Sequence, residues 1–354
     1  MNAKMIAITV LAAFVSVSAA LAQTRSGQPQ PQPTPQPQEP KPYGVPEGYM
    51  IIEGDIIVPV DFYEKGEPAA TFTTFLRLWH DGIVPYEFDI DPSSPGYVSP
   101  SRRNAMIQAM ADWEAVANVD FVPRNGQSDY IFIQDSDRNS SFVGRQGGKQ
   151  VVNIFNWDRE FIMAHELGHA LGYWHEQSRL DRDNFIQIIW DNIPDDKKHN
   201  FQSRQEGGEY GPYDFDSVMH YNQCAFSNCS NCPDNNACPS GGRTIVVKPP
   251  FDTQWQSAIG QRNHLSVMDR LTMSFMYPEP NWRFLDLSCR CFLLNCIRAG
   301  DFFCPYDDMA DAVNRTPAGG TLWLRTPGTY SALATYNKPM TIRCGYGTCE
   351  LRGQ

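Results

Sequence analysis

The sequence predicts an α+β fold, in which a mixed sheet packs against helices and a small cysteine-rich, mostly β region follows at the C-terminus. Three observations support this class. Short β-branched stretches alternate with helical ones between residues 78 and 278, one helical stretch carries clustered histidines, and all 10 cysteines lie from Cys224 onward. We therefore expect everything before Cys224 to fold without disulfides.

The N-terminal residues predict export. Lys4 precedes an apolar run from Met5 to Ala22 that ends in small residues, which is the order of a signal peptide (residues 1–22). A membrane anchor is the alternative, but the run is short for a span and rich in Ala, Ser and Thr. We expect a secreted protein, extracellular or periplasmic, with no membrane span. The net charge of -11 argues against nucleic acid as a partner.

Two segments separate the signal peptide from the first domain. Residues 23–48 are rich in Pro and Gln and predict an extended, disordered linker. Residues 49–69 begin with an apolar run from Met50 to Ile57 that contains Glu53-Gly54-Asp55. Taken alone, this run is a short strand interrupted by a turn. Upstream of a metal motif, however, a carboxylate beside a flexible glycine could occupy an open metal position, which makes Asp55 a candidate ligand.

The following elements predict the mixed sheet and its helices. Ile83–Phe88 is a first strand, and Ser99 is an N-cap for an amphipathic helix that runs to about Val116. An exposed edge strand could pair with an extended peptide. The further predicted strands are Asp120–Pro123, Tyr130–Ile133 and Val151–Phe155.

A histidine motif follows these strands. His165 and His169 are four residues apart, so a helix places both imidazoles on one face, where they can bind one cation. Glu166 beside them is suited to take a proton from water at the metal. Gly172 lets the chain leave the helix, and His175 returns as a third ligand. Three protein ligands leave one position open, which is typical of a catalytic zinc site.

The extended motif is more specific than its core. A bare HExxH occurs by chance in helices, whereas HExxHxxGxxH is typical of metzincins, which also carry a downstream Met-turn. Residues Ser217–Tyr221 are a candidate Met-turn centred on Met219.

On these residues the chain resembles the astacin family of metzincin zinc endopeptidases, over about residues 52–277. The strongest segment is His165–Ile186, HELGHALGYWHEQSRLDRDNFI. The resemblance implies a metzincin catalytic domain, residues 70–278, with a mixed sheet, an active-site helix and a Met-turn. Further matches are Phe121–Arg124, Phe142–Gly144, Tyr213–Tyr221 and Leu265–Tyr277.

The resemblance also implies roles for individual residues. His165, His169 and His175 would bind one Zn2+, and Glu166 would be the general base. Tyr221 would stabilise the oxyanion, although an ordinary core tyrosine is the alternative.

Other family positions concern packing and latency. Met219 would underlie the metal, and Glu176 would receive the freed mature N-terminus. Ile52–Asp55 resembles the family's FxGD aspartate switch, with Ile in place of Phe, so Asp55 would hold zinc in the latent form only. Residues 49–69 would then be a pro-segment, removed by an activating protease or by self-cleavage near Ala69 or Ala70.

The chain also departs from the family pattern. Members usually carry two disulfides in this domain, but Asn118, Asn139 and Trp157 stand at three of the cysteine positions. The closing helix ends at Tyr277-Pro278 without the fourth. The domain is therefore expected to lack both bridges.

A cysteine-rich loop follows the Met-turn. Its spacing fits a small zinc knot or two disulfides, and export favours disulfides. Beyond it, Lys248 could face an S1' pocket as a cation that prefers acidic residues, or it could be a solvated lysine. The loop cysteines are Cys224, Cys229, Cys232 and Cys238.

Residues 279–354 contain six further cysteines and predict a disulfide-stapled unit. Its strands resemble the first rungs of a right-handed parallel β-helix. Because a solenoid needs several repeats, this region packs on the protease domain, is a remnant, or recognises a partner.

The resulting functional prediction is a secreted zinc endopeptidase that hydrolyses peptide bonds in extracellular proteins. It would be made as a latent proenzyme, with protein or peptide substrates. The alternative is a secreted binding or matrix-associated protein with a vestigial zinc site. The intact Glu166 and Tyr221 favour the enzyme.

Overall fold

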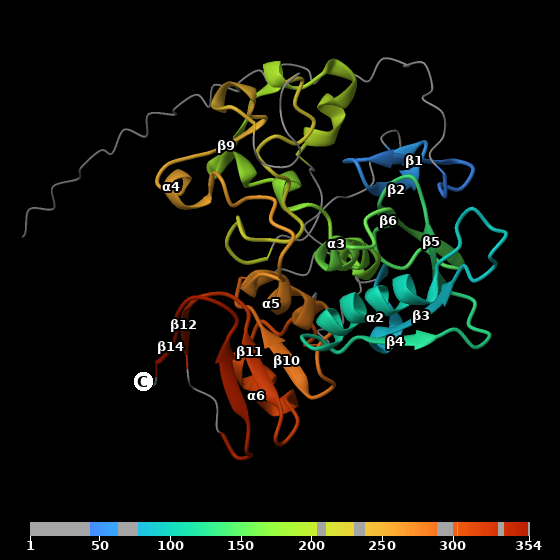
Figure 1. Cartoon of the computed structure of the whole chain (residues 1–354). Helices are drawn as coiled ribbons and strands as arrows, with labels where there is room; N and C mark the ends of the chain where they lie inside the picture. Colours follow the sequence, from blue (N-terminus) through green and yellow to red (C-terminus); the bar gives the residue numbers. More distant parts are fainter. Residues whose placement is uncertain are drawn as a thin grey trace, which may run out of the picture. The chain divides into compact units, whose positions relative to one another are not determined.

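A computed structural model describes residues 43–62, 77–203, 210–229, 238–288, 300–302, 304–331 and 336–352 (Figure 1). The predicted signal peptide, most of the predicted linker and the expected cleavage point near Ala69 or Ala70 lie outside these residues. So do Cys232, Cys289, Cys291 and Cys296. No helix within the described ranges is long and apolar enough to cross a membrane.

A seven-stranded mixed sheet, in the order β1-β2-β6-β7-β5-β3-β4, forms the first half of the fold. Strands β7, β5, β3 and β4 are parallel neighbours, whereas β6 is antiparallel to β7. The predicted mixed sheet and each predicted strand are confirmed. The strands are β1 (Tyr49–Ile52), β2 (Ile56–Pro59), β3 (Ile83–Phe88), β4 (Asp120–Pro123), β5 (Tyr130–Asp135), β6 (Ser140–Phe142) and β7 (Lys149–Ile154).

Two helices pack together beside this sheet, and both contribute to the main core (Figure 1). Helix α2 (Pro100–Glu114) begins after Ser99, whose side chain accepts a hydrogen bond from the Arg102 amide, as the N-cap prediction requires. Helix α3 (Glu160–Leu171) contacts β6 and β7 and is buried from Met163 to its end. The Trp113 indole donates to the Ala164 carbonyl at 2.9 Å, which fixes α2 against α3.

Helix α3 ends at Gly172, where the backbone has φ 125°. A residue with a Cβ is strained there, so the predicted role of this glycine is confirmed. The chain then reverses, and His175 returns toward the helix. Short 3-10 helices connect later elements: η2 (His80–Gly82), η3 (Glu176–Ser178), η4 (Arg182–Asn184), η5 (Trp190–Asn192), η6 (Asp195–Phe201) and η7 (Ser240–Gly242).

The second half of the protease region has its own apolar cluster. Strands β8 (Ile186–Ile188) and β9 (Ile245–Val247) pair antiparallel, with α4 (Asp252–Trp255) beside β9. Their side chains pack with Phe201, Phe215 and Tyr221. Helix α5 (Val267–Met276), the predicted closing helix, returns to the main core and begins with a Ser266–Asp269 capping box.

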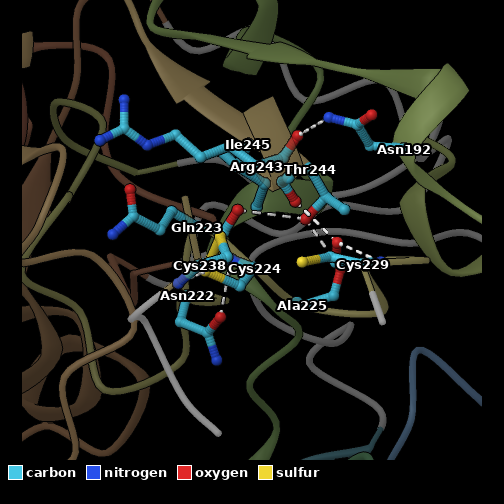
Figure 2. Close-up of a disulfide and its surroundings, with 12 residues drawn as sticks. Asn192, Asn222, Gln223, Cys224, Ala225, Cys229, Cys238, Arg243, Thr244 and Ile245 are labelled. Atoms are coloured by element: carbon cyan, nitrogen blue, oxygen red, sulfur yellow. Dashed lines mark hydrogen bonds between the residues drawn. A yellow bond between two sulfur atoms is a disulfide. The ribbon is translucent and has the colours of Figure 1, made fainter. Parts of the chain in front are cut away.

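The cysteine-rich loop contains a disulfide between Cys224 and Cys238. Figure 2 shows this bridge near the start of β9. There the Gln223 carbonyl accepts the amide of Thr244 at 2.8 Å and that of Ile245 at 3.2 Å. Cys229 is disulfide-bonded as well. The disulfide alternative for this loop is thus confirmed, and the zinc knot is wrong for these cysteines.

The C-terminal region is mostly β, as predicted, and contains a Cys344–Cys349 disulfide. Its strands pair in parallel, β10-β11-β13 in one sheet and β12-β14 in another. Phe284, Phe302 and Trp323 from this region belong to the main core, so the tail packs on the protease region. The elements are β10 (Trp282–Leu285), α6 (Met309–Arg315), β11 (Thr321–Leu324), β12 (Gly328–Ser331), β13 (Thr341–Cys344) and β14 (Cys349–Arg352).

Candidate metal centre

Three imidazoles converge at the end of α3. The Nε2 atom of His165 lies 3.1 Å from that of His169 and 3.4 Å from that of His175. All three rings are buried. The (i, i+4) spacing places the first two on one helix face, and the turn at Gly172 brings the third. The sequence prediction that these histidines meet is confirmed by the structure.

The Nδ1 atoms explain why all three Nε2 lone pairs are available. His165 Nδ1 donates to the Val218 carbonyl at 2.8 Å, and His169 Nδ1 donates to the Tyr173 carbonyl at 2.7 Å. His175 Nδ1 donates to the Glu53 carboxylate at 2.8 Å. A proton on each Nδ1 atom satisfies these acceptors and leaves each Nε2 able to present a lone pair to a metal, which is the tautomer that a metal ligand needs.

Asp55 lies over the same point. One carboxylate oxygen is 3.2 Å from His165 Nε2, and the other is 3.2 Å from His175 Nε2 and 3.6 Å from His169 Nε2. Within the described residues, Asp55 Oδ1 has no hydrogen-bond donor although it is buried. The turn between β1 and β2 that carries Asp55 includes Glu53 at φ 49° and Gly54 at φ 79°.

This donor set fits a zinc ion. The four ligand atoms lie within 4.8 Å of one another. A tetrahedral ion with zinc–nitrogen bonds of about 2.0–2.1 Å separates its ligand atoms by about 3.3 Å, close to the spacings above. Imidazole nitrogens with one carboxylate are typical zinc ligands, and Asp55 Oδ1 lies 3.2 Å from His175 Nε2 and 3.6 Å from His169 Nε2, where a shared ion would fit between them.

Glu166 lies beside the cluster but does not join it. Its side chain is buried, and among the described residues its Oε2 atom has no hydrogen-bond donor. Burial raises the pKa of Glu166 well above its usual range, and the charge of Asp55 adds to this effect. A carboxylate with a raised pKa is a stronger base, as the predicted role requires.

The Met-turn packs against α3 next to the ligand histidines. A Cβ at Gly168 would come within 3.1 Å of Met219 Sδ, so the methionine packs directly against the helix turn between the two ligands. The Asp269 carboxylate of α5 accepts the Val218 amide at 2.8 Å and the Ser217 hydroxyl at 2.7 Å. Val218 in turn accepts the His165 proton, so α5 orients a ligand through the Met-turn.

Tyr221 stands at the edge of the cluster, with its ring centroid 4.8 Å from that of His175. Its hydroxyl donates to the backbone carbonyl of Glu53. The ring also packs against Phe226 of the disulfide loop, at 5.8 Å between centroids. Tyr221 is therefore packed among aromatic rings, as a core tyrosine would be. It also lies beside a proposed metal ligand, as the family role requires.

Glu53 and Arg262 were not singled out by the sequence. Glu53 is fully buried and contacts both His175 and Tyr221. The only signal was an acidic residue inside an apolar run, next to Asp55. The charge of the partly buried Arg262 adds to the effect of burial in lowering the pKa of His165 to about 3, which keeps that imidazole neutral.

Glu176 lies behind the metal cluster in a small pocket that also contains Arg179, Asp214 and Asp269. Its carboxylate accepts the Asp214 amide at 2.8 Å and pairs with Arg179 at 3.3 Å. Burial raises the pKa of Glu176 to about 8, and the charge of Arg179 only partly opposes this.

Lys248 is the remaining predicted site residue. It follows β9, and its ammonium donates to the Asp183 carbonyl. It is not part of the metal cluster, and its proposed S1' role stays a prediction.

The fold and the site together define a class of protein. A mixed sheet, a ligand helix that ends in glycine, three convergent imidazoles and a supporting Met-turn are the features of the metzincins. Residues 72–278 match the family model described as Astacin (Peptidase family M12A). The chain therefore belongs to the astacin family.

Relatives of known name agree with this assignment. Human tolloid-like protein 1 is 36% identical over 235 residues, 63% of this chain and 21% of that protein. Zinc metalloproteinase nas-14 of Caenorhabditis elegans is 37% identical over 213 residues, 57% of this chain and 37% of that protein. The chain thus spans much less than two thirds of these relatives.

Among solved structures, the chain is similar to high choriolytic enzyme 1, a hatching enzyme zinc-protease from the medaka fish Oryzias latipes. The TM-score is 0.50 and the identity 28%, over 60% of this chain and 98% of that one.

Proposed function

We propose that this chain is a zinc-dependent endopeptidase that hydrolyses internal peptide bonds. The observation that carries this proposal is the convergence of three buried imidazoles, whose ligand atoms meet at one point next to the buried Glu166. The nas-14 relative is a zinc metalloproteinase and the medaka relative a zinc-protease, which agrees with the donor set.

The residues take the following roles in the proposal. His165, His169 and His175 would hold zinc, which when bound would supply a Lewis acid for the scissile carbonyl and for water. Glu166 accepts a proton from the attacking water and returns it to the leaving amine, so no proton is gained or lost overall. The Tyr221 hydroxyl donates a hydrogen bond to the oxygen on which negative charge develops.

Latency is the second part of the proposal. We assign residues 49–69 as a pro-segment, 70–278 as the catalytic domain and 279–354 as a C-terminal region. Asp55 takes the fourth ligand position, and β2 pairs with β6, so the segment covers both the metal and a strand edge. A substrate peptide needs that space, so removal of the segment, by another protease or by self-cleavage, precedes activity.

Glu176 completes the activation scheme. We propose that its buried carboxylate receives the ammonium of the new N-terminus, which gives the ionised acid a second cation besides Arg179. Lys248 remains the proposed cation of the S1' pocket.

Export supports this setting. The signal-peptide pattern of residues 1–22 and the disulfides near the C-terminus favour an oxidising compartment outside the cytosol. We propose that the substrates are extracellular proteins or peptides.

A casein digest tests the activity. Processed protein should cleave casein, lose activity with a zinc chelator and regain it when zinc is restored. Processed protein that contains one zinc per chain and leaves casein and gelatin intact would instead favour the binding-protein alternative.

A further inference from the structure

We propose that Glu53 is a positioning residue for the metal ligand His175, delivered by the pro-segment and lost with it on processing. The proposal rests on the proposed latent zinc site. It concerns a different residue from Asp55 and a different contact: Asp55 reaches the Nε2 side of the cluster, and Glu53 holds the opposite nitrogen of one ring.

The first support is the pair of hydrogen bonds at one oxygen. Glu53 Oε2 accepts from His175 Nδ1 at 2.8 Å and from the Ser178 hydroxyl at 2.9 Å. A carboxylate behind a ligating histidine fixes the ring's tautomer and orientation and raises its basicity. The other two ligand histidines donate only to backbone carbonyls, at Val218 and Tyr173.

The second support is burial. The side chain of Glu53 is fully buried, as is that of His175. A charge without a partner is costly in such a place, so these hydrogen bonds help to keep the carboxylate there. Its hydrogen bonds to residues more than 120 positions away fix the turn against the cluster.

The third support is the backbone of the same residue. Glu53 adopts φ 49°, an uncommon conformation for a residue with a side chain. In this conformation its carbonyl accepts the hydroxyl of Tyr221 while its carboxylate holds His175. One residue of the pro-segment thus engages both a metal ligand and the proposed oxyanion donor.

It follows that the metal site has two states, one in the latent form and one in the processed form. In the latent form His175 has a carboxylate partner, and Tyr221 is engaged by a carbonyl. Once the segment leaves, His175 Nδ1 and Ser178 lose their shared acceptor, and the Tyr221 hydroxyl is released. Glu53 therefore strengthens zinc binding specifically in the proenzyme.

The experiment measures the affinity for zinc rather than the catalytic activity. Full-length proenzyme is prepared as wild type, Glu53→Ala and Glu53→Gln, and the zinc affinity is obtained by competition with a chromogenic chelator. We expect Glu53→Ala to weaken zinc binding by about 10- to 100-fold. Glu53→Gln keeps an acceptor oxygen but loses the charge, so its affinity should lie between the two. Glu47→Gln, at an exposed position two residues before the pro-segment begins, is the control and should match wild type.

Processing supplies an internal check on folding. The mature chains released from all these proenzymes are identical in sequence, so they should have equal zinc affinity and equal activity. The free energy of unfolding of the zinc-free proenzymes is compared as well. Because no zinc is present, this comparison reports how strongly Glu53 anchors the segment, apart from any effect on the metal. Wild-type zinc affinity in Glu53→Ala would overturn the proposal, as would an equal loss in Glu53→Ala and Glu47→Gln.

Failure of the proposed function looks different. If Asp55→Ala proenzyme is as inactive as wild type, latency through Asp55 is wrong, whereas the zinc affinity of Glu53→Ala still decides the role of Glu53. If Asp55→Ala is active and Glu53→Ala keeps wild-type zinc affinity, only the present inference fails.

Discussion

At the scale of single residues, the metal site is organised by the destinations of three imidazole protons. Two go to backbone carbonyls of the protease region, and one goes to the Glu53 carboxylate. These acceptors, rather than the ligand spacing alone, select the tautomer that presents three Nε2 lone pairs. Beside them stand a buried base and a buried hydroxyl, whose roles can be tested separately.

Replacement of Glu166 by Gln tests the base. The amide is similar in size but cannot accept the proton, so the processed variant should lose activity by about 100- to 10,000-fold. Zinc content, measured by atomic absorption, should stay at one ion per chain, because Glu166 lies outside the ligand set. A variant with retained turnover would contradict the assigned role.

Replacement of Tyr221 by Phe tests the oxyanion donor. The ring packing against His175 should persist while the hydroxyl is lost. We expect kcat of the processed enzyme to fall by about 100- to 1,000-fold with little change in KM, since the bond strengthens only in the transition state. A rise in KM at constant kcat would place the hydroxyl in substrate binding instead.

Asp214 gives a prediction about pH. Burial raises the pKa of Asp214 to about 7, and the charge of Asp269 adds to the effect. The native proenzyme therefore holds a proton that the unfolded chain releases near pH 4, and its stability should fall as pH rises from about 4 to 7. In Asp214→Asn, urea unfolding across this range should show a smaller decline. An unchanged slope would show that Asp214 is not the titrating group.

Much of this site could be predicted from the sequence because its main ligands are local. His165 and His169 are related by helix geometry, and Gly172 marks the turn that returns His175. Glu53 could not be found this way, since its partners lie 122 and 125 residues later in the chain. No local sequence pattern predicts such a contact, and the sequence suggested only that Glu53 lies in a turn.

At the scale of elements, the closing helix α5 connects the fold to the site. Asp269 accepts from Ser266, Ser217 and Val218, so it caps the helix and holds the Met-turn with one carboxylate. At Asn118, where the resemblance implies that a cysteine is missing, hydrogen bonds connect the chain to the end of α5. Asn118 donates its amide to the Tyr277 carbonyl at 3.0 Å and its side chain to the Pro278 carbonyl at 3.2 Å.

Replacement of Asp269 by Ala tests this connection. Buried amide and hydroxyl donors would lose a charged acceptor, so the free energy of unfolding should fall by about 3 kcal/mol or more. Asp308→Ala is the matched control, because Asp308 only caps α6 and should cost about 1 kcal/mol. Urea unfolding compares the two, and equal losses would contradict a special role for Asp269.

At the scale of the whole molecule, the C-terminal region shares the core of the protease region. The ring of Phe275 on α5 lies 4.9 Å from Trp323, 5.3 Å from Phe284 and 5.6 Å from Phe302, between centroids. The sequence predicted β3, β4, β5 and β7 of the first sheet, because each has a local apolar pattern, but it did not predict β6, whose sequence is Ser-Ser-Phe. It did not decide whether the tail packs there, since that depends on contacts between distant aromatic residues. The β-helix resemblance stays a prediction.

Replacement of Phe302 by Ala tests the shared core. The side chain is buried, so its truncation should lower the free energy of unfolding by about 3–5 kcal/mol. Because the core is common, the tail and the protease region should unfold in one transition. Leu351→Ala, at an exposed position, should change stability by less than about 0.5 kcal/mol. Two separate transitions in wild type would contradict a shared core.

The proposed mechanism depends on one ligand position at the metal, which Asp55 would fill in the latent form and which substrate and water would need in the active form. Its most direct test is peptide hydrolysis by unprocessed Asp55→Ala proenzyme, with chain length verified by mass spectrometry. We predict chelator-sensitive hydrolysis by the variant while unprocessed wild type stays inactive. An inert variant that still binds zinc, or unprocessed wild type as active as the mature chain, would contradict the account.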